Sequence, residues 1–246
     1  MSAQPDERGA HAWAAPIERL TVGDGHINVT GRRPTAPMNG FGRMWQKTYR
    51  TAIAAAEPSE VITVWKQNFS DFWPAGNRFF APLAGIAPGE VAALDLSMPG
   101  GLKLSTGVLV LFADDESFTL MTPEGHMFAG WITFSAYREG DATVAQAQVL
   151  MRASDPLYEI GMTLGGHRQE DAHWVHTLRS VAAHFGEPGA AGAEVDVQTV
   201  CVDRKRQWSR AGNVRHNAGI RSGLHTAGAP FRALTRGRSR TAKAQG

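Results

Sequence analysis

Residues 155–186 constrain the fold most, because they carry the pattern of one long helix late in the chain. Asp155 and Pro156 are typical of a helix start, since aspartate caps free backbone N–H groups and proline fits the first turn. Apolar residues then recur at steps of three and four, as on one face of a helix. The Gly165-Gly166 pair predicts a kink within it. The stripe comprises Leu157, Ile160, Leu164, His167, Asp171, Trp174, Leu178, Val181 and Phe185.

The segment before this helix has the punctuation of an antiparallel meander. Short apolar runs alternate with turns such as Asp114-Asp115-Glu116 and Glu139-Gly140-Asp141. A strand is also expected at 42–53, followed by a short helix that opens at Pro58. About six strands result, which is enough for one curved sheet, and they are expected at 42–53, 90–98, 104–112, 117–122, 126–138 and 142–153.

We expect one main domain in this chain of 246 residues. It spans 17–190, with its core at 42–186. Residues 1–16 are small, polar and proline-containing, so we expect them to be disordered, as we do 237–246. Between these limits, 191–236 is expected to form an additional strand near 195–202 and a basic, partly helical extension. The sequence leaves open which strand the additional one pairs with.

Composition places the protein in a reducing compartment. Cys201 is the single cysteine, so one chain forms neither an internal disulfide nor a thiolate zinc cluster. The first thirty residues lack the apolar run of a secretory signal, and no segment approaches the roughly 20 apolar residues of a membrane span. We therefore expect a cytoplasmic protein, at most peripheral to a membrane.

Charge is distributed unevenly along the chain. Eleven of the 25 basic residues lie from residue 204 onward, where no acidic residue occurs, so the preceding part carries 14 basic and 23 acidic residues. A basic tail next to an acidic body could bind an anionic bilayer, or nucleic acid nonspecifically, with nucleic acid the less favoured partner. Alternatively, the tail folds onto the acidic body or only solubilises the protein. The predicted anion-binding residues are Arg204, Lys205, Arg206, Arg210 and Arg215.

The order of strand, short helix, antiparallel meander and long closing helix resembles the SRPBCC superfamily. This group has the helix-grip fold and includes START domains and birch-pollen-allergen-like proteins. The resemblance covers about 42–186 and includes the Asp155-Pro156-Leu157-Tyr158 helix start. It implies an α+β helix-grip fold, with a curved sheet wrapped around the long helix and an apolar cavity between them. Hydrophobic small molecules or lipids are the ligands that such cavities hold.

Two sets of residues are candidates for the site. His167 and Asp171 are four residues apart, so they can meet on one helical face, where the carboxylate favours protonation of the imidazole. Such a pair could catalyse proton transfer on a bound carbonyl compound, as in a polyketide cyclase or hydratase. The alternative is a solvated ion pair near Arg168. The candidate ligand contacts are His126, Trp131, Phe134 and Trp174, for which exposure of His126 and ordinary core packing of the three aromatics are the alternatives.

Other chemistries lack support in the sequence. Among His167, Asp171, His173 and His176, the first two share a different helical face from the last two, and no HExxH pattern occurs, so no metal site is expected. No GxGxxG, no Gly-Lys-Ser/Thr and no GxSxG is present, so we expect neither a nucleotide cofactor nor a serine hydrolase. The preferred function is the binding of a hydrophobic small molecule, and an enzyme or a membrane-associated or nucleic-acid-associated protein are the alternatives.

Overall fold

The computed structural model describes residues 12–23, 26–53, 56–98, 103–186 and 193–227. The disorder that we expected for 1–11 and 237–246 concerns residues outside these ranges. The elements are η1 (Pro37–Asn39), β1 (Met44–Ile53), α2 (Pro58–Gln67), β2 (Arg78–Phe80), β3 (Val91–Ser97), β4 (Lys103–Ala113), β5 (Ser117–Met121), β6 (Phe128–Glu139), β7 (Ala142–Ala153), α3 (Pro156–Gly161), η3 (Met162–Gly166), α4 (His167–Phe185), β8 (Asp196–Asp203), η5 (Trp208–His216) and α5 (Ala218–Ala227).

One antiparallel sheet contains all the strands, in the order β2-β3-β4-β5-β6-β7-β1-β8. The six predicted strands are present, but the sheet has eight strands rather than six. The additional ones are β2, which is three residues long and pairs with β3, and β8, which pairs with β1. A strand as short as β2 has too few residues to show an alternating pattern.

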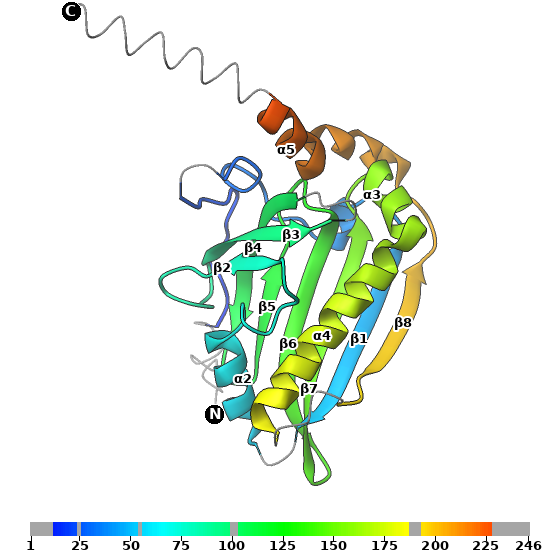
Figure 1. The fold of residues 1–246 in the computed structure, drawn as a ribbon. Helices are drawn as coiled ribbons and strands as arrows, with labels where there is room; N and C mark the ends of the chain where they lie inside the picture. Colours follow the sequence, from blue (N-terminus) through cyan, green and yellow to red (C-terminus); the bar gives the residue numbers. More distant parts are fainter. Residues whose placement is uncertain (1–11, 24–25, 54–55, 99–102, 187–192, 228–246) are drawn as a thin grey trace, which may run out of the picture.

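The long helix α4 crosses the inner face of the curved sheet, and α2 covers another part of the same face (Figure 1). Between them lies an aromatic core in which Trp65, Phe118 and Phe134 are fully buried. Phe118 and Phe134 stack with their ring centroids 4.7 Å apart, and Phe69 packs edge-on against both. This arrangement confirms the predicted α+β helix-grip fold.

The predicted helix is interrupted where the sequence has its glycine pair. The Asp155 side chain caps α3 by accepting from the backbone N–H groups of Leu157 and Tyr158. The π-helical segment η3 follows, and within it Gly165 has φ 131°, a conformation that favours glycine. α4 begins after this irregular turn, so the two halves of the helix do not share one continuous face.

This break changes which side chains are buried. Leu178 and Val181 on α4 are fully buried, as the predicted stripe requires. Leu157, Ile160 and Leu164 are exposed by 49, 55 and 81%, so the first half of the stripe does not face the core. The π-helical turn inserts residues into the helical repeat and thereby rotates one half of the helix relative to the other.

Both ends of the described chain pack on the domain. The backbone N–H of Ala14 donates a hydrogen bond to the Leu111 carbonyl on β4. Residues 12–16 therefore pack on the domain, whereas we had expected them to be disordered. The C-terminal segment, which we define as residues 204–227, covers the end of the sheet opposite the β6–β7 hairpin (Figure 1). The buried amide of Asn217 donates to Asp155, and the buried Arg152 donates to Lys205 O. Residues 204–227 of the basic tail thus pack on the domain.

Candidate ligand cavity

A cavity of about 860 Å³ lies between the sheet and the α3–α4 helices. Its volume falls in the upper part of the range of roughly 300–1,000 Å³ that small-molecule sites occupy. Its walls are mostly apolar and come from the inner faces of five strands and from the helices. Representative wall residues are Leu96, Val108, Ile132, Met151, Met162 and Trp174.

His126, which precedes β6, lines this cavity and is buried rather than exposed at a turn. Its Nδ1 accepts a hydrogen bond of 3.0 Å from the Phe128 backbone N–H. The neutral imidazole must therefore carry its proton on Nε2. Burial lowers the pKa of His126 to about 4 and outweighs the Phe128 bond, so the ring is neutral at pH 7. His126 is thus a neutral imidazole that can donate one hydrogen bond, from Nε2.

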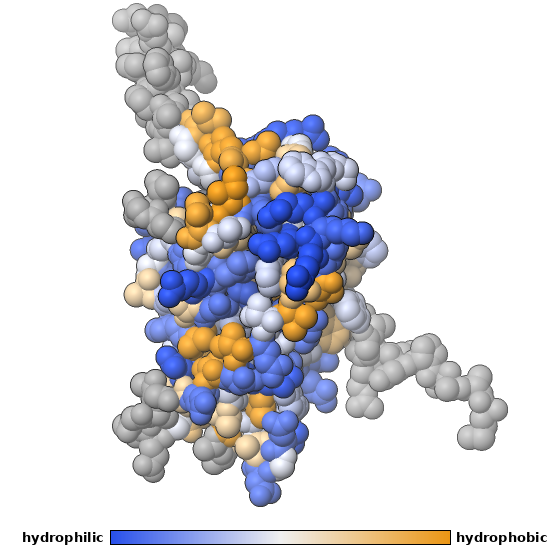
Figure 2. Space-filling view, turned by 90° about the vertical axis from the view of Figure 1, so that its right-hand side faces the viewer, coloured by the Kyte–Doolittle hydropathy of each residue, from blue (hydrophilic) through white to orange (hydrophobic). Residues whose placement is uncertain are grey.

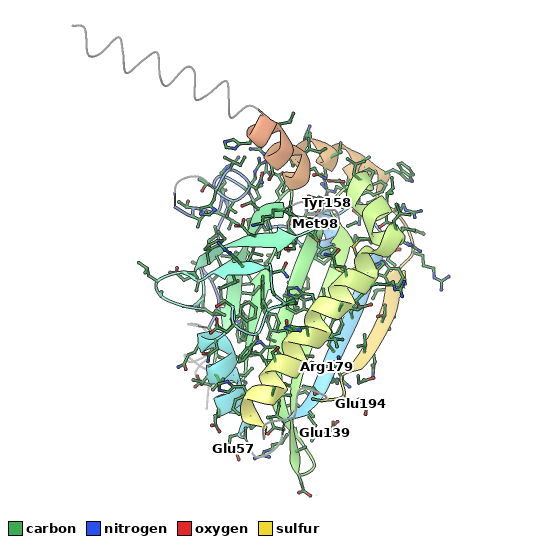
Figure 3. The ribbon with its side chains drawn as sticks, in the orientation of Figure 1. Glu57, Met98, Glu139, Tyr158, Arg179 and Glu194 are labelled. Carbon is green, nitrogen blue, oxygen red and sulfur yellow. The ribbon has the colours of Figure 1, made fainter. Side chains whose placement is uncertain are left out.

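Tyr158 on α3 also lines the cavity, at the end of the molecule that carries α5 (Figure 3). Its hydroxyl oxygen accepts from the Gly219 backbone N–H at 3.1 Å. Burial raises the pKa of Tyr158 to about 12, so the phenol keeps its proton. The hydroxyl hydrogen is therefore free to donate to another group.

The helix α4 contributes Glu170 and His173 to the cavity wall. His173 packs against Trp73 and Trp174, and burial lowers its pKa to about 4. Glu170 is 8% exposed, and its Oε2 lies 2.9 Å from Lys47 Nζ. Neither carboxylate oxygen of Glu170 accepts a hydrogen bond from the described residues. The contact with Lys47 is therefore an ion pair without hydrogen-bond geometry. Burial raises the pKa of Glu170 to about 7 despite the nearby Lys47.

Lys47 connects this carboxylate to a second one. The lysine lies on β1 and is 1% exposed, and its Nζ is 2.7 Å from Asp171 Oδ1. Tyr49 donates to the same oxygen at 2.7 Å. Burial raises the pKa of Tyr49, so this phenol also stays protonated. The cluster thus holds one cation and two carboxylates, and among the described residues Asp171 accepts hydrogen bonds whereas Glu170 does not.

His167 and Asp171, the predicted catalytic pair, are not among the residues that line the cavity. No hydrogen bond or ion pair joins them within the described chain; instead, the His167 ring packs on Trp45 at 4.9 Å. Asp171 does raise the pKa of His167, as expected from the sequence, but it is not the largest influence. Burial and the Lys47 charge lower the pKa of His167 to about 4, and these effects outweigh Asp171. The kink at η3 turns both residues toward β1.

The predicted aromatic contacts lie in three different places. Trp174 lines the cavity and packs edge-on against Phe134 at 5.4 Å. Phe134 is fully buried in the core behind it. Trp131 borders the cavity, but it pairs with Met121, which packs with Leu20 and Val29 on the outer face. Since successive side chains of a strand alternate, the Trp131 ring belongs to the face opposite Ile132.

The predicted anion-binding residues Arg204, Lys205, Arg206, Arg210 and Arg215 are all exposed. Arg206 forms an ion pair of 3.0 Å with Glu159, and Arg215 Nε lies 3.0 Å from His216 Nε2. Their binding to an external anion stays a prediction.

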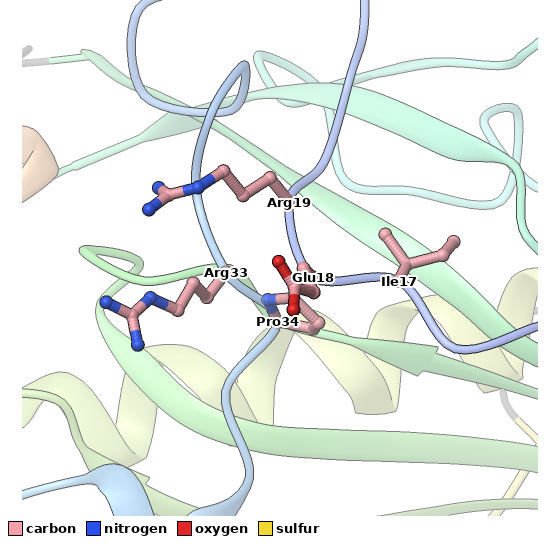
Figure 4. Close-up of a pocket in the computed structure, with 5 residues that line it drawn as sticks. All are labelled: Ile17, Glu18, Arg19, Arg33 and Pro34. Atoms are coloured by element: carbon pink, nitrogen blue, oxygen red, sulfur yellow. The ribbon is translucent and has the colours of Figure 1, made fainter.

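Two further features carry no assignment. A pocket of about 340 Å³ lies at the surface between Ile17, Glu18, Arg19, Arg33 and Pro34 (Figure 4). In the ranges that the structure describes, no group of three or more His, Cys, Asp or Glu side chains is arranged to hold a metal ion. Nor does any helix in those ranges have the length and apolar composition needed to span a membrane.

Sequence reasoning missed Glu170, Lys47 and Tyr158. A glutamate on a helix is ordinarily exposed, so Glu170 gave no signal of burial. The sequence does give a signal of burial for Lys47. It lies two residues from both Trp45 and Tyr49 and therefore shares the inward face of β1 with them. A lysine in such a position requires a buried carboxylate opposite.

No family model matches the sequence, and no curated protein matches it. Solved structures to which the fold is similar include Protein Ms6760 from Mycobacterium smegmatis, with 13% identity over 58% of this chain and 91% of that one and a TM-score of 0.41. A START superfamily protein from the same organism has 18% identity over 58% and 97%, with a TM-score of 0.39.

The di-domain ARO/CYC protein StfQ from the steffimycin biosynthetic pathway is also similar, with 11% identity and a TM-score of 0.46. The match covers 61% of this chain and 52% of StfQ. Identities this low concern the fold alone and transfer no ligand or reaction. The order of the elements in this chain is that of the helix-grip fold expected from the sequence.

Proposed function

We propose that the protein binds a hydrophobic small molecule or lipid in the cavity between its sheet and α3–α4. The observation that carries this proposal is the cavity itself, about 860 Å³ in volume and walled mainly by apolar side chains. Apolar surface of this extent is costly to leave in contact with water, and an apolar ligand removes that contact. The proposal is one of binding, because the predicted catalytic pair does not line the cavity.

Native mass spectrometry of the freshly purified protein tests this function. A co-purifying apolar molecule, released and identified after denaturing extraction, is the expected result. If the protein purifies without a bound ligand, titration with a fluorescent apolar dye tests whether the cavity binds apolar molecules. Two results would count against the proposal. One is that the wild type does not bind the dye, and the other is that Ile132→Phe, which fills part of the cavity, binds the dye as tightly as the wild type does.

A second candidate function, docking on an anionic lipid surface, rests on a separate observation. Large apolar side chains lie exposed on α3, η3, η5 and α5 at one end of the molecule, and Figure 2 shows apolar and hydrophilic groups side by side there. Leu164 also lines the cavity, so the apolar surface continues into it. Exposed basic side chains of the C-terminal segment match anionic headgroups in charge. The apolar set is Leu157, Ile160, Leu164, Trp208, Ile220 and Leu224.

Flotation with phosphatidylserine-containing and pure phosphatidylcholine vesicles tests this docking. We expect binding to the anionic vesicles only, reduced by salt and by Ile160→Ser with Leu164→Ser. Leu83→Ser is the matched control, since Leu83 is equally apolar and fully exposed but lies in the β2–β3 loop. Equal losses in both variants, or binding to oligonucleotides in place of vesicles, would refute the lipid surface as the partner.

A further inference from the structure

The cavity has a distinct polar end beneath the C-terminal segment. His126 and Tyr158 both line the cavity, one beside the 123–126 turn and the other on α3. The Gly125 carbonyl accepts from Ala218 N at 2.9 Å, and the Tyr158 hydroxyl accepts from Gly219 N at 3.1 Å. Two consecutive residues of the C-terminal segment therefore bond to the backbone beside His126 and to the Tyr158 side chain, which places both residues at the same end of the cavity.

Both side chains have a donor left over after these contacts. Phe128 N–H occupies Nδ1 of His126, which leaves the Nε2–H. Gly219 N–H occupies a lone pair of the Tyr158 oxygen, which leaves the hydroxyl hydrogen. No acceptor for either hydrogen exists in the described part of the chain. A ligand acceptor in the cavity would give each of these hydrogens a partner, and one such hydrogen bond contributes about 0.5–1.5 kcal/mol.

The neighbouring polar atoms are already used. Thr122, another polar side chain of the cavity wall, donates to Gly130 O and accepts from Gly130 N, each at 3.1 Å. His126 and Tyr158 are both uncharged at neutral pH, for the reasons of burial given above. The polar end thus offers hydrogen-bond donors, but no net charge that would favour a carboxylate or an ammonium group.

We infer that His126 Nε2–H and the Tyr158 hydroxyl form a donor pair that recognises the carbonyl oxygen of an otherwise apolar ligand. This inference rests on the proposed binding function and specifies its ligand class as an apolar ketone, quinone or ester. A carbonyl oxygen has two lone pairs and so accepts from both donors. The carbonyl carbon would be polarised in the process, but no bond is made or broken.

The test compares two dyes of the same shape. One is an acyl-dimethylaminonaphthalene ketone, and the other is its alkyl analogue, in which CH₂ replaces the carbonyl. The wild type should bind the ketone more tightly, and Tyr158→Phe should weaken ketone binding about three- to tenfold while leaving the analogue unchanged. His126→Leu should do the same, whereas His126→Gln, which keeps an N–H donor, should retain most of the affinity.

Infrared spectroscopy of the bound ketone adds a readout that a merely structural role would not change. The carbonyl stretch should shift to lower wavenumber in the wild type and return to its apolar-solvent position in Tyr158→Phe with His126→Leu. If the double variant does not fold, the shift in the wild type by itself tests whether the bound carbonyl accepts hydrogen bonds. Equal affinity for both dyes with an unshifted carbonyl band would overturn the donor pair and leave cavity binding intact. Binding of neither dye would refute the binding function itself.

Discussion

Lys47 Nζ and Asp171 Oδ1 lie 2.7 Å apart, although 124 residues separate them in the chain. The contact joins the buried face of β1 to the first turns of α4 and so ties the long helix to the sheet. Glu170 adds a second carboxylate at 2.9 Å on the side of the cavity. Because one cation serves two carboxylates, the ionisation of this cluster is coupled to the stability of the fold.

Replacing Lys47 with Met should destabilise the protein by about 3 kcal/mol, because two carboxylates lose their buried cation. Adding Glu170→Gln to this variant should recover part of the loss, since the unpaired buried carboxylate is then gone and Asp171 keeps its bond from Tyr49. Urea unfolding of both single variants and the double variant measures the coupling. Simple additivity of the two single-variant changes in stability would contradict the shared cluster.

Glu170→Gln should also change how stability depends on pH. The pKa of about 7 in the folded protein lies above the ordinary 4.5, so between these values the native state holds a proton that the unfolded chain releases. The wild type therefore loses stability as the pH rises from about 4.5 to about 7, by about 1.4 kcal/mol per unit of pKa shift. Above that range the loss levels off.

The buried His126 and the half-buried His167 and His173 contribute in the opposite direction. Each has a pKa lowered to about 4, so their ionisation favours the unfolded state as the pH falls from 6.5 to about 4. Subtracting the Glu170→Gln profile from that of the wild type removes this common part. The difference should be near zero at pH 4.5 and favour the variant at pH 8; a flat difference would mean that Glu170 titrates normally.

Ile132 and Phe134 share one strand and one face but differ in environment. Ile132 lines the cavity, whereas Phe134 is fully buried behind it. Ile132→Phe should fill part of the cavity and weaken binding of an apolar dye, with a change in stability of less than about 1.5 kcal/mol. Phe134→Leu should do the reverse, lowering stability by about 1–3 kcal/mol and leaving dye affinity nearly unchanged. Indistinguishable dye affinities in the two variants would place the ligand elsewhere.

Gly125→Ala should detach the C-terminal segment from the 123–126 turn. Gly125 has φ 90°, and an added Cβ would lie 2.1 Å from the His216 carbonyl oxygen. Gly89 has the same φ but nothing within 4 Å, so Gly89→Ala isolates the cost of the backbone strain, about 1 kcal/mol. Faster hydrogen exchange at the Ala218 amide, which donates to Gly125 O, should appear in Gly125→Ala only. Equal exchange in the two variants would show that the clash is relieved without moving the segment.

Much of the fold follows from local patterns in the sequence. The six predicted strands and the kinked closing helix are present, because alternation of period two and helical spacing act over a few residues. The cap at Asp155 and the break at Gly165 also depend on local backbone preferences alone. These features require no knowledge of what packs against each element.

The site depended on tertiary structure instead. The rotation of α4 after the π-helical turn replaced His167 and Asp171 with Glu170 and His173 in the cavity wall. A helical wheel assumes one unbroken repeat, so it cannot report a phase change of this kind. Likewise, burial decides the protonation of Glu170 and His126, and burial depends on strands and helices that are distant in sequence.

The sequence by itself thus determined the type and order of the elements, because their signals lie in neighbouring residues. Only the tertiary structure decided that the basic segment covers one end of the cavity, where Ala218 and Gly219 bond to Gly125 and Tyr158. It also decided which polar groups face the ligand, because hydrogen-bond satisfaction depends on partners brought together from distant parts of the chain.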